Sequence, residues 1–130
     1  MEPGTHWLPF EALPQIEAQL VAKAWQVFSL PERIVSKANF FDAVRCLLPL
    51  DPPLVSNRSW DALSDSLWQG IYGLPNDHVA IIWKDPNALA TAAPSDHRIA
   101  MDILHGLTES LADPTPTLGK TKALAVILGQ

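Results

Sequence analysis

The sequence predicts an α/β fold in which helices pack against a three-stranded parallel sheet. Three short apolar runs without polar alternation support this prediction, at residues 25–30, 79–83 and 124–128. Strands buried on both faces of a parallel sheet have this composition, because helices cover both sides. Helical periodicity in the intervening segments supplies those covering layers. A chain of 130 residues is long enough to bury one hydrophobic core without disulfides or metals.

The expected elements follow one another with prolines between them. An N-terminal helix over residues 14–23 leads into the first strand, whereas residues 1–13 show no readable pattern. Ser36 is the expected N-cap of the next helix. That helix places an apolar stripe inward: Phe40, Phe41, Val44, Leu47 and Leu48.

Three further helical segments complete the prediction. One helix spans residues 59–70, and a short helical turn covers residues 85–92. A longer helix begins at Ser95 and precedes the last strand. Its expected inward positions are Ile99, Ile103, Leu107 and Leu111.

The single cysteine and the N-terminus bear on the compartment. Cys46 lies in an apolar helical pattern and has no partner for an internal disulfide, so we expect a buried, inert thiol and a reducing environment. The first residues lack the basic start and apolar stretch of a secretory signal. No apolar run approaches the roughly 18 residues that a membrane span needs. We therefore expect a cytoplasmic protein without membrane contact.

Negative charge is concentrated in the middle of the chain. The formal net charge is −5, and residues 51–113 alone carry nine acidic and three basic residues. Such a surface repels the backbone of nucleic acids and accelerates association with basic proteins. The charge distribution favours a basic protein partner over direct binding of nucleic acid.

The helix over residues 59–70 has two different faces. Successive residues turn by about 100°, so Trp60, Leu63 and Leu67 form an apolar stripe that must pack inward. Asp61, Asp65 and Trp68 share the opposite face. Like charges four residues apart destabilise a helix, which leaves this arrangement without a local benefit. Aromatic residues beside charges are typical of hot spots in protein interfaces.

Residues 56–67 also carry a family resemblance. Their core, Trp-Asp-Ala-Leu-x-Asp-x-Leu at residues 60–67, resembles the signature of the barstar family of ribonuclease inhibitors. The end of the second predicted strand, Ile81-Ile82-Trp83, is similar to the family's aliphatic-x-Trp pattern. The resemblance covers residues 17–130, which we expect to form a barstar-like domain, with residues 1–16 as an N-terminal extension.

The resemblance implies a stoichiometric inhibitor whose acidic helix enters a ribonuclease active site, where carboxylates replace RNA phosphates. The family's two principal acids correspond to Asp61 and Asp65, and a third acid on the last long helix to Glu109. Asn57 stands where the family has a turn glycine. This change is mild, because asparagine also tolerates a left-handed conformation. With Trp68 and Arg58, these residues form the expected partner-binding set.

Several residues depart from the family pattern. Val55-Ser56 replaces an aromatic pair of the contact surface, Ser59 replaces the helix-opening asparagine, and Ser64 replaces a helix tryptophan. Serine is a good N-cap, so the change at Ser59 is mild. The lost aromatics weaken the expectation of binding to the archetypal ribonuclease, and Trp68 is the expected replacement anchor.

Catalysis is the competing class of function. Paired carboxylates can act as general acid and base, but a helix face opposite its packed stripe should be convex, and the chain has no nucleophile motif. Asp102, His105 and Glu109 share a helical face without the histidine spacing of a metal site. Residues 119–121, Gly-Lys-Thr, resemble the end of a phosphate loop, but a strand follows them. We therefore expect no enzyme, metal or cofactor.

Three functions remain in order of preference. The first is an inhibitor or immunity protein against a secreted-type ribonuclease. The second is a barstar-like interaction module that binds another basic protein that is not a nuclease. The third is a carboxylate-dependent hydrolase.

Overall fold

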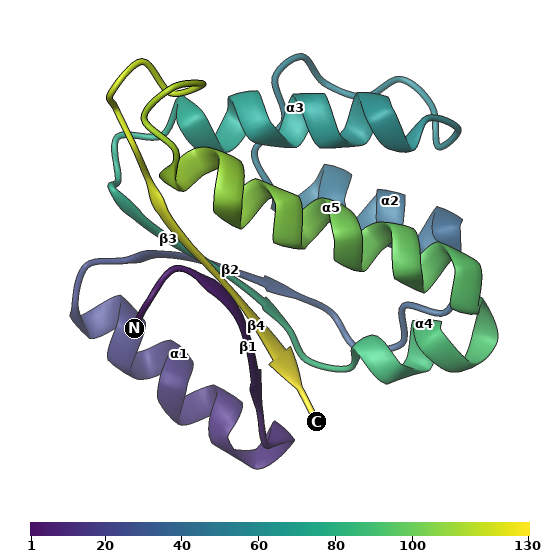
Figure 1. Ribbon diagram of the computed structural model, residues 1–130. Coiled ribbons are helices and arrows are strands. Elements are labelled where there is room, and N and C mark those ends of the chain that lie inside the picture. Colours follow the sequence, from purple (N-terminus) through teal and green to yellow (C-terminus); the bar gives the residue numbers. More distant parts are fainter.

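The computed structural model describes residues 1–130 and consists of a parallel sheet covered by helices on both faces (Figure 1). The strand order across the sheet is β1-β4-β3-β2, and every neighbouring pair is parallel. The strands are β1 (Gly4–Leu8), β2 (Gln26–Leu30), β3 (His78–Trp83) and β4 (Ala123–Gly129). The α/β class and the three predicted apolar strands are confirmed, since β2, β3 and β4 coincide with the three runs.

The sheet has four strands, so the prediction of three was wrong. The fourth strand is β1, which pairs with β4 in the register Thr5 to Val126 and Trp7 to Leu128. This strand lies at one edge of the sheet, and its side chains are partly or largely exposed. Exposure explains the missed prediction, because a short edge strand does not need the continuous apolar run that a central strand shows.

The helices form two layers of unequal size (Figure 1). Helices α2, α3 and α5 lie on one face of the sheet, and α1 lies on the other. The bounds are η1 (Phe10–Ala12), α1 (Leu13–Ala22), α2 (Lys37–Leu47), α3 (Trp60–Tyr72), α4 (Pro86–Ala92) and α5 (Pro94–Ala112). No helix is both long and apolar enough to cross a membrane.

The larger core lies between the sheet and the layer of α2, α3 and α5. Its largest fully buried side chains include Trp83 of β3 and Phe40 and Phe41 of α2. The rings of Phe40 and Phe41 pack against Trp60 at the start of α3, and the Phe40 ring also packs against Trp83. Gly70 allows α3 to pass against the chain segment after α2, since a Cβ there would meet the carbonyl of Pro49. Close packing of this kind holds α3 in a fixed position on the sheet.

Three expectations about burial were wrong. Leu47 and Cys46 are exposed, because both lie on the outer side of the last turn of α2. Ile99 of α5 is also exposed, and Ile103 is only partly buried. The buried face of α5 instead consists of Ala100, Leu104, Leu107, Thr108 and Leu111. The stripe is displaced because Ile99 and Ile103 face α3 rather than the sheet.

Candidate partner-binding groove

The start of α3 fixes which side of this helix faces the solvent. Ser59 is the N-cap, and its hydroxyl accepts a hydrogen bond of 3.1 Å from the main-chain N–H of Ala62. Leu63 and Leu67 are fully buried, and Trp60 packs against the rings of α2 while remaining partly exposed. The opposite face of α3 is therefore free to present polar groups to a partner.

Side chains of α2 hold the loop that precedes α3. The guanidinium of Arg45 donates to the side-chain oxygen of Asn57 and forms an ion pair of 3.1 Å with Asp42. Asn57 donates in turn to Asp42 at 3.3 Å. The ammonium of Lys37 donates to the carbonyl of Arg58 at 2.7 Å. Asn57 does not adopt a left-handed conformation, so its role in this turn is to connect the loop to α2.

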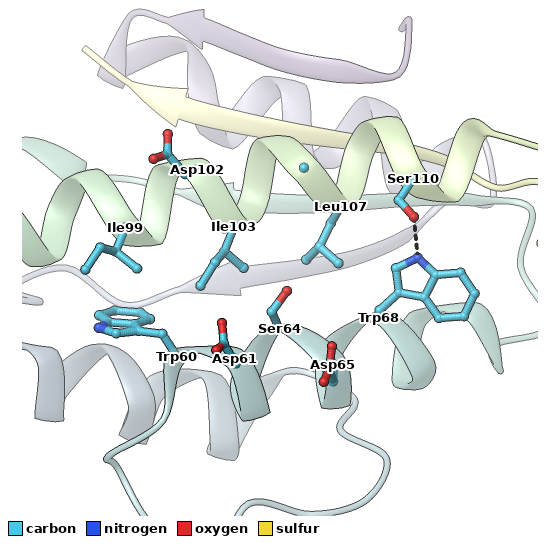
Figure 2. Close-up of a pocket in the computed structure, with 11 residues that line it drawn as sticks. Trp60, Asp61, Ser64, Asp65, Trp68, Ile99, Asp102, Ile103, Leu107 and Ser110 are labelled. Carbon is cyan, nitrogen blue, oxygen red and sulfur yellow. Dashed lines mark hydrogen bonds between the residues drawn. The ribbon is translucent and has the colours of Figure 1, made fainter. Parts of the chain in front are cut away.

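A groove of about 510 Å³ runs between α3 and α5 (Figure 2). Asp61 and Asp65 line the groove from α3, and Asp102 lines it from α5, with a carboxylate that is directed away from α3. The full lining is Trp60, Asp61, Ser64, Asp65, Trp68, Ile99, Asp102, Ile103, Gly106, Leu107 and Ser110. The expectation of a convex acidic surface was wrong, because α5 stands beside α3 and converts the exposed side of α3 into one wall of a groove.

The groove carries negative charge without compensation. None of the carboxylates of Asp61, Asp65 and Asp102 forms an ion pair, and no lysine, arginine or histidine lines the groove. All three residues are exposed. Uncompensated charges of one sign along a hollow surface create a potential that attracts a cationic partner from a distance. The arrangement is therefore suited to receiving basic side chains.

Apolar side chains complete the groove. Ile99 is 37% exposed, and Ile103 and Leu107 follow it along α5 at helical spacing (Figure 2). Trp60 faces them from α3. An apolar surface surrounded by charged groups is the composition of an interface centre, where buried area supplies affinity and the charges supply orientation.

A comparison with protein families shows which family the chain belongs to. The family described as Barstar (barnase inhibitor) matches residues 25–120, which include β2, α2, α3, β3, α4 and α5. The chain belongs to the barstar family. Both walls of the groove lie inside the matched residues. No curated protein and no solved structure gives a significant match to the chain.

Membership in the barstar family indicates a protein-binding role. The barstar family is a family of protein inhibitors that bind ribonucleases, and it is not a family of enzymes. The structure has no group of three or more His, Cys, Asp or Glu side chains arranged to hold a metal ion.

Trp68 connects the two walls of the groove in this barstar-family protein. Its indole N–H donates to the hydroxyl of Ser110 at 2.9 Å, which joins α3 to α5 (Figure 2). Its ring stacks on Tyr72 at a centroid distance of 4.9 Å. These contacts leave Trp68 partly exposed at one end of the groove, in a fixed orientation.

The structure does not bring Glu109 into the groove. Glu109 pairs with His105 at 3.3 Å, and the other ring nitrogen of His105 is 3.2 Å from the hydroxyl of Thr5 on β1. Asp102 occupies the wall of α5 instead, together with Gly106 and Ser110 at intervals of four residues. The four-residue interval already shows in the sequence that Asp102, Gly106 and Ser110 share one side of α5. The sequence alone does not say which side of α5 faces α3.

Proposed function

We propose that this barstar-family protein is a stoichiometric inhibitor of a basic ribonuclease and blocks the enzyme's active site with the acidic face of α3. The observation that carries the proposal is the groove between α3 and α5, which is lined by three aspartates without ion pairs and by no basic residue. A ribonuclease active site binds RNA phosphates with basic side chains. Carboxylates held at a fixed spacing can occupy the same positions.

Asp65 and Asp61 are the principal inhibitory groups in this proposal. They lie one helical turn apart, so both can face the same cleft of a partner. Removing one member of a charge pair that is buried on binding costs 2–5 kcal/mol or more, because the other charge is left without a partner. The two aspartates would therefore determine how slowly the complex dissociates.

Asp102 is the third carboxylate that we propose for the interface. It lines the groove from α5, where Figure 2 shows its carboxylate directed away from α3, whereas Glu109 is engaged with His105 outside the groove. Glu109 would act only at the rim, where a charge mainly alters the association rate.

The loop before α3 supplies the remaining contacts. Asn57 and Arg58 would touch the partner beside the active-site cleft. The hydrogen bonds from Arg45 and Lys37 already order this loop in the free protein. Binding would then cost less conformational entropy than it would for a loose loop.

A different basic protein is the second candidate partner. Val55 is 99% exposed and Ser56 is exposed at the positions where the family resemblance implies an aromatic pair. The loop therefore presents no aromatic contact residue at these two positions. A Lys-rich or Arg-rich protein without nuclease activity would also fit the acidic groove.

Affinity capture distinguishes the two candidates. The wild-type protein and a D61N/D65N/D102N variant are immobilised separately and exposed to lysate and secreted proteins of the source organism at low salt. The proposal predicts that the wild type alone retains a small basic protein with ribonuclease activity after elution. Retention of a basic protein without that activity supports the second candidate. Equal retention by both columns contradicts a role for the groove.

A further inference from the structure

A second pocket lies at the opposite end of α3 from the start of the acidic groove. Its volume is about 540 Å³, and it lies among the end of α3, the loop before β3 and the loop before β4. Both loops reach the left end of α3 in Figure 1. Its charged and hydroxyl-bearing lining residues include Asp77, Lys120, Thr121 and Lys122. This volume is within the range of small-molecule sites, about 300–1,000 Å³.

Lys122 places a buried positive charge in the wall of this pocket. The residue is only 6% exposed, and its ammonium donates to the carbonyls of Leu74 and Asn76 at 2.6 Å each. An ammonium has three donors, so these two bonds leave one donor. Carbonyl groups satisfy hydrogen bonds but do not neutralise the charge, and Lys122 forms no ion pair. A buried charge without a counter-charge is costly, and a bound anion would relieve that cost.

Two neighbours add to the anion-binding character. Lys120 is exposed, lines the same pocket and also forms no ion pair. Thr121 lies between the two lysines in the sequence and also lines the pocket. Asp77 opposes them, and its unpaired carboxylate would repel an anion. The lining therefore holds two positive charges and one negative charge in a protein whose net charge is −5.

We propose that this pocket binds the phosphate group of a small phosphorylated molecule. The charge of a phosphate group, about −1.5 to −2 near neutral pH, matches the two ammonium groups better than a carboxylate does. Its oxygens would accept from the remaining donor of Lys122 and from the exposed ammonium of Lys120. The site is not a phosphate loop, because β4 follows directly and the donors are side chains. Its position at the end of α3 separates it from Asp61 and Asp65.

A titration with inorganic phosphate tests the site without a known natural ligand. Backbone amide signals of the ¹⁵N-labelled protein are followed by NMR as phosphate replaces chloride at constant ionic strength. The expected result is saturable shifts confined to residues 73–77 and 119–122. Acetate at the same concentration should bind more weakly. Shifts that do not saturate, or that acetate reproduces equally, would overturn the proposal.

Charge variants at exposed positions provide the second readout, because K122A risks unfolding. K120Q should weaken phosphate binding at least about tenfold, the scale of one lost charge-assisted hydrogen bond. D77N should strengthen it several-fold by removing the opposing charge. K84Q is the matched control, since Lys84 follows the other end of β3 and should leave the affinity unchanged. Equal affinities for the wild type, K120Q and D77N would contradict the site.

Discussion

The two walls of the groove differ in what they offer a partner. The α3 wall presents Asp61 and Asp65, whereas the α5 wall presents Ile99 and Ile103 and has a single acidic residue, Asp102, whose carboxylate is directed away from α3. Charges act over several ångströms and weaken with salt, but apolar contacts act only when water has been displaced. The α3 wall should therefore govern recognition and its salt dependence, and the α5 wall should add affinity that salt does not weaken.

The largest effect is expected at Leu67, which packs α3 against the hydrophobic core. Leu67 is fully buried, so L67A should lower the free energy of unfolding by about 2–5 kcal/mol. Chemical denaturation followed by circular dichroism measures this loss. Q69A, at an exposed position of the same helix, is the control and should change stability little. A loss below about 1 kcal/mol for L67A would mean that α3 does not bury this face.

Removing a single charge from the α3 wall should have the next largest effect. D65A should weaken binding to the partner by about 2–5 kcal/mol, mainly through faster dissociation. D61A and W68A should cost less, and E109A should cost least because Glu109 lies outside the groove. Surface plasmon resonance separates the two rates.

The matched control for these charge variants is E11A, which removes an exposed carboxylate of η1, outside the groove. It should leave both rates unchanged. Comparable losses for E11A and D65A would show that only net charge matters. Melting temperatures should stay nearly constant for D61A, D65A and E109A, because none of these side chains is buried.

The α5 wall gives a smaller effect of a different kind. I99A should weaken partner binding by about 1 kcal/mol through lost apolar contact, and the loss should be the same at low and high salt. V21A, at an exposed apolar position of α1, should have no effect on binding. A loss for I99A that disappears at high salt would contradict the proposed division between the walls.

The smallest effect concerns the start of α5, where His97 packs 6.1 Å from the Trp83 ring. Burial lowers the pKa of His97 below its ordinary value of 6.5, so the unfolded chain binds a proton more readily than the folded protein. This contribution to stability is present above about pH 6.5 and is lost as the pH falls toward the folded pKa. H97Q should flatten the pH dependence of the unfolding free energy in this range. An unchanged slope would contradict it.

Local pattern was sufficient for α3 but not for α5. The N-cap Ser59 and the stripe containing Leu63 and Leu67 are local signals, and the structure contains both. The stripe of α5 also looked regular, yet Ile99 faces the groove. Periodicity finds the apolar side of a helix, but it cannot assign that side to the sheet or to a neighbouring helix.

The same reasoning explains why Asp102 and β1 were missed. The sequence placed Asp102 on a helix, but only the packing of α5 beside α3 makes it a residue of the groove lining. Strand β1 is short, lies at the edge and contains polar Thr5 and His6, so it lacks the signal of a buried strand. The concave shape of the site likewise depends on two helices that are distant in the sequence.

The most direct test of the central claim is a titration of the captured basic ribonuclease with this protein while RNA cleavage is measured. We expect a linear loss of activity that is complete at one inhibitor per enzyme, and an association rate that falls steeply with added salt. The D61N/D65N/D102N variant should leave the enzyme active at the same ratio. Full inhibition by that variant, together with an association rate that does not depend on salt, would show that another surface binds the ribonuclease.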